Sequence, residues 1–161
     1  MLKELNILIV EDVPRDAEAI EAELRSEAIS FSARRLETKD AFLTELKNLA
    51  PDLVLCDFTL PEFNALEALR LLRENKYDIP FILVTGSRSE EVAVECIREG
   101  ADDYVLKTSL KRLPSSILNV LRKKAAEREK AKAEAALRRS EEQYRDCRKH
   151  PGSDQPGGSA R

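Results

Sequence analysis

The sequence predicts an α/β fold in which a parallel sheet is covered by helices on both faces. Short apolar runs alternate along the chain with segments of helical period, which is the pattern of repeated βαβ units. The runs are apolar throughout, as expected for strands that are buried on both faces. At 161 residues, with 42% hydrophobic and 35% charged residues, the chain is long enough for one such domain and an additional segment.

Five segments are predicted to be strands. Four are apolar runs, at residues 7–10, 53–56, 81–84 and 104–106. The fifth, at residues 31–36, carries Ser32, Arg34 and Arg35 and therefore suits an edge of the sheet, where one side of a strand meets solvent.

Five amphipathic helices are predicted between and after these strands. In the first four, apolar residues share a face: Ala17, Ile20 and Leu24; Phe42, Leu46 and Leu49; Leu66, Leu69 and Leu72; and Val92, Ala93, Cys96 and Ile97. Pro14 fits the start of the first helix and Thr38 the N-cap of the second. Gly100 stands where a glycine commonly ends a helix, after the fourth.

The fifth helix is expected to run from about Ser109 to about Lys149. Leu113, Ile117 and Val120 give its first part an apolar face. Its later part is rich in Ala, Glu, Lys and Arg, with a thin alanine seam, so both a weak coiled-coil dimer and a solvated single helix remain open. Residues 150–161, rich in Gly, Pro and Ser, are expected to be disordered and resemble an artificial junction.

Polar residues converge where the predicted strands end. In a parallel α/β sheet, ligands bind beyond the carboxyl ends of the strands. The residues at these ends are Glu11 and Asp12 after the first strand, Asp57 after the third, Thr85 after the fourth and Lys107 after the fifth. Three carboxylates in one place repel unless a cation lies among them, and oxygen ligands of this kind suit Mg²⁺.

These residues have the parts for phosphoryl transfer to a carboxylate. Asp57 is the candidate nucleophile, Asp12 and Asp57 the candidate metal ligands, and Lys107 and Thr85 the candidate partners of the phosphoryl oxygens. Each residue taken alone also has a structural interpretation, such as a helix cap for Glu11 or Asp12. Their coincidence at four strand ends favours the functional interpretation.

Four segments resemble the receiver domain of two-component response regulators. They are ILIVEDVPRD, LVLCDFTLPEFNALEAL, ILVTGS and GADDYVLK. The resemblance covers residues 4–124 and implies a doubly wound, flavodoxin-like (βα)5 fold with strand order 2-1-3-4-5. It implies that Asp57 is phosphorylated with Mg²⁺ present by a histidine kinase or phosphotransfer protein. The domain would catalyse its own phosphorylation and dephosphorylation, without acting on a separate substrate.

The resemblance also assigns further roles by position. Glu11 is implied to reach the metal beside Asp12, the backbone carbonyl of Thr59 to be a third protein ligand, and Tyr104 to be an aromatic switch together with Thr85. One position departs from the family pattern. Thr108 follows Lys107 where the family usually has a proline on a cis bond, which leaves the geometry of this peptide bond open.

A second resemblance lies in LRRSEEQYRD, which is similar to the lead-in before PAS sensor domains of sensory histidine kinases. It implies that residues 125–149 are a helical linker toward a PAS-like domain outside this sequence, in a sensory or hybrid histidine kinase. A homodimer through this helix is compatible with the same pattern.

Three other functions remain as alternatives. A degenerate receiver would act only as a dimerisation or interaction module. An aspartyl-phosphate phosphatase would need a second acid two residues after the nucleophile, where Thr59 stands. A flavin-binding domain would need a phosphate-binding loop after the first strand, where EDVPRD places acids instead.

Charge and cysteine content restrict partners and location. A net charge of -3 and a pI near 5.4 argue against nucleic-acid and anionic-membrane surfaces. The three cysteines show neither pairing nor metal-ligand spacing, so reduced thiols in a cytoplasmic protein are expected. The N-terminal apolar run is too short for a signal peptide or a membrane span.

Overall fold

The computed structural model describes residues 4–86 and 90–149. Its strands are β1 (Leu5–Val10), β2 (Phe31–Leu36), β3 (Leu53–Cys56), β4 (Phe81–Thr85) and β5 (Asp103–Leu106). Its helices are α1 (Pro14–Ser26), α2 (Lys39–Leu49), α3 (Ala65–Glu74), α4 (Glu90–Arg98), the 3-10 helix η1 (Lys107–Arg112) and α5 (Leu113–Lys149). The chain divides into two compact units after Arg122. The predicted tail at 150–161 lies outside the described residues.

The first unit is built on a five-stranded parallel sheet of order β2-β1-β3-β4-β5. This order confirms the predicted doubly wound, flavodoxin-like fold and the edge position of β2. All four residues of β3 and all five of β4 are buried, whereas in β2 three residues are exposed, two are partly buried and only Leu36 is buried. The apolar runs therefore occupy the centre of the sheet, where both faces are covered.

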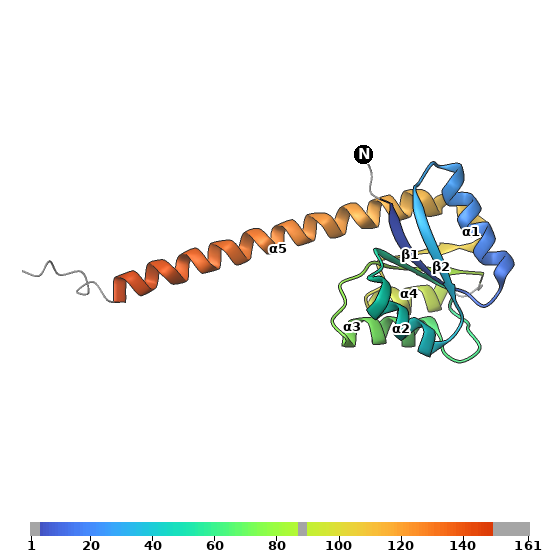
Figure 1. Ribbon diagram of the computed structural model, residues 1–161, viewed down its shortest axis with the longest axis horizontal. Helices are drawn as coiled ribbons and strands as arrows, with labels where there is room; N and C mark the ends of the chain where they lie inside the picture. Colours follow the sequence, from blue (N-terminus) through green and yellow to red (C-terminus); the bar gives the residue numbers. More distant parts are fainter. Residues whose placement is uncertain (1–3, 87–89, 150–161) are drawn as a thin grey trace, which may run out of the picture. The chain divides into compact units, whose positions relative to one another are not determined.

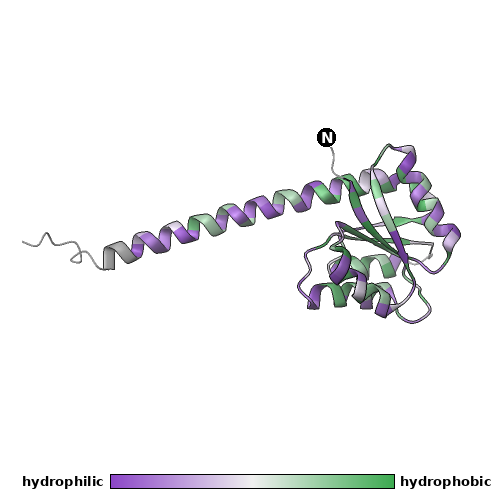
Figure 2. Ribbon diagram, viewed as in Figure 1, coloured by the Kyte–Doolittle hydropathy of each residue, from purple (hydrophilic) through white to green (hydrophobic). Residues whose placement is uncertain are grey.

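Helices cover both faces of this sheet (Figure 1), and a hydrophobic core lies on each face. Residues of β1 alternate between them, because successive side chains of a strand point to opposite faces: Ile7 and Ile9 join one core, Leu8 and Val10 the other. The first core contains α1 and the start of α5, and the second contains α2, α3 and α4. The central strands are correspondingly hydrophobic in Figure 2.

Helix boundaries follow local capping chemistry. Pro14 occupies the first turn of α1, as predicted, and the Thr38 hydroxyl accepts a hydrogen bond of 3.1 Å from the backbone N–H of Ala41. Beyond α4, Gly100 has a φ of 113°, in the left-handed region that a glycine enters without a Cβ clash.

The predicted start of the fifth helix at Ser109 is wrong. Residues Lys107–Arg112 form the 3-10 helix η1, within which Ser109 has φ -133° and ψ 42°, and α5 begins only at Leu113. Pro114 explains this boundary. A proline is accepted in the first turn of an α-helix but removes a backbone donor and clashes with the preceding turn further in.

The edge of the sheet at which the strands begin is tied together by Arg73. Its guanidinium donates hydrogen bonds of 3.0 to 3.1 Å to three backbone carbonyls, those of Tyr77, Ile79 and Gly100. The carboxylate of Asp102 accepts a hydrogen bond of 2.9 Å from Phe81 N–H at the start of β4. These bonds join the end of α3 to the segments that lead into β4 and β5.

The second unit contains the part of α5 beyond Arg122. It is mainly hydrophilic in Figure 2, and its large apolar residues Leu137 and Tyr144 are 60% and 64% exposed. Within the described part of the chain, no helix combines the length and the apolar character that crossing a membrane requires.

Candidate functional site

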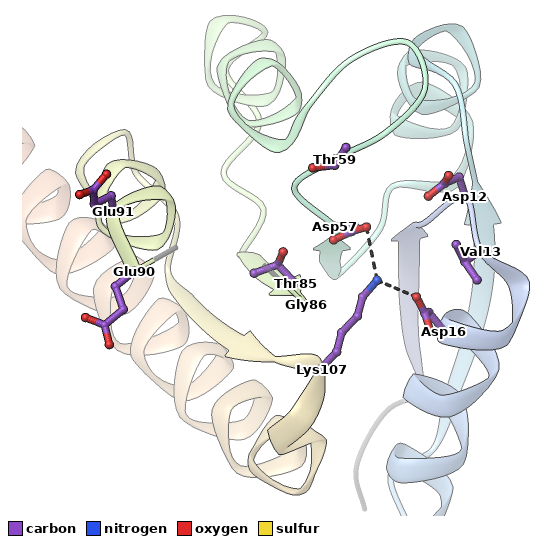
Figure 3. Close-up of a pocket in the computed structure, with 10 residues that line it drawn as sticks. All are labelled: Asp12, Val13, Asp16, Asp57, Thr59, Thr85, Gly86, Glu90, Glu91 and Lys107. Carbon is purple, nitrogen blue, oxygen red and sulfur yellow. Dashed lines mark hydrogen bonds and ion pairs between the residues drawn. The ribbon is translucent and has the colours of Figure 1, made fainter. Parts of the chain in front are cut away.

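A pocket opens at the edge of the sheet where the strands end (Figure 3). The predicted residues among those that line it are Asp12, Asp57, Thr59, Thr85 and Lys107. They come from the loop after β1, the end of β3 and the loop beyond it, the end of β4 and the start of η1. The parallel topology thus brings together residues that are as far apart in the sequence as Asp12 and Lys107.

Asp57 is held rigidly at the end of β3. Its backbone N–H donates a hydrogen bond of 2.9 Å to the carbonyl of Val10 in the neighbouring strand β1. Its carboxylate Oδ1 accepts a hydrogen bond of 2.9 Å from Phe58 N–H, and the side chain is 13% exposed. One carboxylate oxygen is therefore fixed by the backbone, while Oδ2 faces Lys107.

Three carboxylates form a group suited to a hard cation. Glu11, Asp12 and Asp57 each offer an oxygen atom, and these atoms lie within 4.8 Å of one another. Glu11 lies beneath the pocket with its side chain only 2% exposed. Its Oε2 atom forms an ion pair with Lys107 Nζ at 2.7 Å and has no further polar partner among the described residues. A buried carboxylate oxygen that contacts a positive charge and has no further polar partner is suited to bind a metal cation.

Burial changes the protonation of Glu11. Loss of hydration raises the pKa of this carboxyl above its ordinary value, and the nearby Asp57 charge raises it further. The contact with Lys107 and a hydrogen bond of 3.1 Å from Val13 N–H act in the opposite direction but do not cancel the effect of burial. Glu11 therefore takes up a proton more readily than an exposed glutamate.

Lys107 supplies the positive charge of the pocket. Its Nζ atom lies 2.7 Å from Glu11 Oε2, 2.8 Å from Asp16 Oδ2 and 3.3 Å from Asp57 Oδ2, and its side chain is 19% exposed. Burial by itself would lower the pKa of Lys107, but the contacts with these carboxylates outweigh burial and raise it. The lysine is thus a permanent cation that three carboxylates share.

Thr85, Thr59 and Tyr104 occupy different surroundings. Thr85 ends β4, is 3% exposed and lines the pocket. Thr59 lies exposed in the loop after β3, where it forms an isolated bridge with Asn64. Tyr104 does not belong to the pocket lining; it is partly buried in β5 and packs against the core formed with α2, α3 and α4.

Asp16 is a pocket residue that the sequence interpretation did not single out. It lies in the first turn of α1, four residues after Asp12, and its carboxylate accepts a hydrogen bond from Lys107. The sequence feature that indicates its position is Pro14 at the start of α1, because the first turn of this helix then lies beside the end of β1. The partner lies 91 residues away, so the contact follows only from the packing of α1 beside η1.

The peptide bond between Lys107 and Thr108 is trans. No peptide bond among the described residues is cis. A trans bond is the low-energy form for any residue that is not followed by proline, and it settles the geometry that the sequence left open.

The fold and the pocket define a class of protein. A 2-1-3-4-5 parallel sheet with three carboxylates and a lysine at its carboxyl edge is a flavodoxin-like α/β domain whose pocket suits a hard cation and an anion.

The chain belongs to the response regulator receiver domain family, whose model matches residues 7–118. Receiver domains are phosphoryl-accepting signalling modules that interact with histidine kinases or phosphotransfer proteins and bind Mg²⁺ at an acidic site. The group formed by Glu11, Asp12 and Asp57 fits such a site.

Two curated proteins are similar to this chain in sequence. The DNA-binding response regulator MtrA of Mycolicibacterium smegmatis is 36% identical over 101 residues, which cover 63% of this chain and 43% of MtrA. The cell cycle transcriptional regulator CtrA of Caulobacter vibrioides is 31% identical over 103 residues, which cover 64% of this chain and 44% of CtrA. The chain thus spans less than half the length of these relatives.

A solved structure has the same fold. The BeF3-activated N-terminal receiver domain of Klebsiella pneumoniae RstA superposes with a TM-score of 0.64 at 29% identity. The superposition covers 73% of this chain and 98% of that domain. The similarity therefore extends over nearly the whole receiver domain of RstA and over about three quarters of the present chain.

Proposed function

We propose that this domain accepts a phosphoryl group on Asp57 from a phosphohistidine of a donor protein, in a Mg²⁺-dependent reaction. The observation that carries the proposal is the meeting of Asp57 with two other carboxylates and Lys107 in one pocket. Membership of the receiver family gives the class of reaction, and the position of Asp57 at the end of β3 gives the acceptor.

Asp57 acts as the nucleophile in this proposal. A carboxylate oxygen forms a bond to phosphorus while the P–N bond to the donor histidine breaks, and the electron pair of that bond stays on the imidazole nitrogen. Lys107 and the hydroxyl of Thr85 hold the phosphoryl oxygens as they arrive. The hydrogen bond from Phe58 N–H keeps the carboxylate oriented during the transfer.

Asp12 and Asp57 would hold Mg²⁺ directly, together with the backbone carbonyl of Thr59, and Glu11 would support the ion from beneath. When bound, the ion supplies positive charge that offsets the negative charge of the carboxylates and of the phosphoryl group. Glu11 is suited to this role because its buried Oε2 is paired with the Lys107 ammonium and has no further polar partner in the described part of the structure.

The conformational response is proposed to pass through Thr85 and Tyr104 to the surface formed by α4, β5 and the first turns of α5. Tyr104 lies in β5 beside this surface. Four apolar side chains of these elements are between 37% and 49% exposed: Val94, Ile97, Leu106 and Leu118. A partner protein can bury these apolar side chains, and a change in the shape of the surface would alter how well that partner binds.

Residues 4–124 are proposed as the receiver and residues 125–149 as a helical linker toward a PAS-like domain of a longer protein. The uninterrupted helix α5 and the segment LRRSEEQYRD support this assignment. Leu137 and Tyr144 stand seven residues apart on this helix, which suits a homodimer seam of heptad spacing. The reading frame of the parent gene tests the linkage.

Incubation with acetyl phosphate tests the proposed reaction. We expect a mass increase of one phosphoryl group in the presence of Mg²⁺ and none when the metal is chelated. Intact-protein mass spectrometry measures the product. A protein that stays unmodified with acetyl phosphate and also fails to bind fluoroberyllate would contradict the proposal.

The raised pKa of Glu11 predicts a pH dependence of Mg²⁺ binding. The pKa of Glu11 in the folded protein lies above 4.5, so this carboxyl takes up a proton at a higher pH than an ordinary glutamate does. A protonated carboxyl no longer attracts the cation. As the pH is lowered, we therefore expect the Mg²⁺ affinity to begin to fall while the pH is still above 4.5. Because the chain has no tryptophan, calorimetric titration is the suitable method. The Glu11→Gln variant should shift the fall to lower pH.

A further inference from the structure

Asp16 holds Lys107 more closely than the proposed phosphoryl acceptor does. Lys107 Nζ donates a hydrogen bond of 2.8 Å to Asp16 Oδ2, whereas it lies 3.3 Å from Asp57 Oδ2 (Figure 3). Of the three carboxylates around this ammonium, Asp16 is the one that meets hydrogen-bond geometry within the described residues. The orientation of Lys107 in this structure therefore depends in part on a residue of α1, together with Glu11 Oε2 at 2.7 Å.

The ordinary role of an acidic residue in the first turn of a helix does not account for this contact. Such a residue interacts favourably with the free N–H groups at the helix start. Asp16 stands in the first turn of α1, but its carboxylate reaches across the pocket to η1. Its side chain remains 36% exposed, so it lies at the mouth of the pocket rather than beneath it.

The contact places Asp16 in competition with a phosphoryl group. An ammonium has three N–H donors, and Glu11, Asp16 and Asp57 already surround that of Lys107. Phosphoryl oxygens that arrive at Asp57 need the same donors. The negative charge of Asp16 has a second effect, because it adds to the attraction of the pocket for a divalent cation.

We propose that Asp16 is a positioning residue that holds Lys107 at the mouth of the pocket in the unphosphorylated domain and competes with the phosphoryl group for its ammonium. The proposal rests on the proposed function of Asp57. It predicts that Asp16 favours Mg²⁺ binding and opposes binding of a phosphoryl group, so that its removal changes the two affinities in opposite directions.

The Asp16→Asn variant tests these two directions. We expect Mg²⁺ to bind about threefold more weakly and fluoroberyllate, at saturating Mg²⁺, about threefold more tightly, as is reasonable for a partly exposed ion pair. Calorimetric titrations of each ligand measure both affinities. A role limited to the folding of α1 would weaken both ligands, because the pocket itself would be distorted.

Two further variants make the result specific. Glu18→Gln removes the same charge from an exposed position of α1 outside the pocket lining and should leave both affinities nearly unchanged. In a Lys107→Met background, the gain in fluoroberyllate affinity from Asp16→Asn should shrink, because the competition for the ammonium is gone.

Each outcome of these titrations is decisive. Weaker binding of both ligands by Asp16→Asn, or no change in either, would overturn the role of Asp16 while leaving the proposed function in place. A wild-type domain that binds neither Mg²⁺ nor fluoroberyllate would overturn both proposals. Opposite changes, absent from Glu18→Gln, would support the role of Asp16.

Discussion

Replacing Asp57 with asparagine is expected to abolish phosphoryl uptake. The amide has nearly the same shape as the carboxylate, but it is neither a charged nucleophile nor a good metal ligand. With acetyl phosphate and Mg²⁺, the Asp57→Asn variant should therefore show no added mass under conditions in which the wild type is modified. Intact-protein mass spectrometry of both proteins measures the difference.

The control for this variant is Asp40→Asn. Asp40 is exposed in the first turn of α2 and does not line the pocket, so the same chemical change there should leave phosphoryl uptake intact. Continued modification of Asp57→Asn would show that another residue is the acceptor. Circular dichroism of both variants establishes that they are folded.

Removal of Lys107 should destabilise the domain in the absence of Mg²⁺. The Lys107→Met variant keeps much of the apolar stem but leaves Glu11, whose side chain is 2% exposed, without its cation. Breaking a largely buried ion pair from one side is costly, so we expect the free energy of unfolding to fall by about 2 kcal/mol. Urea denaturation in the presence of a chelator measures this change.

The same variant should bind Mg²⁺ more tightly, because the carboxylates lose their competing cation. The added metal should then restore part of the lost stability, since a ligand that binds only the folded state stabilises it. Lys111→Met is the matched control: Lys111 is exposed in η1 outside the pocket lining. Equal stability of Lys107→Met and Lys111→Met would contradict the assigned pairing.

The fold could be predicted from the sequence because its central strands are uninterrupted apolar runs. Residues 53–56 are apolar without interruption, and all four are buried in β3. The predicted acids and the lysine also converge, because parallel strands place their carboxyl ends at one edge. The helical period of Leu113 and Ile117 does not by itself mark where the last helix starts; Pro114, which is accepted only in a first turn, sets that start at Leu113.

Contacts within the pocket were less accessible to prediction. The hydrogen bond between Asp16 and Lys107 joins residues that are 91 positions apart. No local pattern encodes it: it depends on how far α1 reaches beside the end of β5, which side-chain packing determines. The burial of Glu11 beneath the pocket, rather than in its lining, depends on packing in the same way.

The hydrogen bonds of Arg73 give the two edges of the sheet unequal stiffness. At the edge where the strands begin, neutral carbonyls and one guanidinium fit each other, and the arrangement needs no ligand to be complete. At the opposite edge, like charges crowd around a single shared ammonium, so the local energy changes whenever an ion enters or leaves. If the pocket binds and releases an ion or a phosphoryl group as proposed, we expect the structural change to be larger at the pocket edge than at the edge held by Arg73.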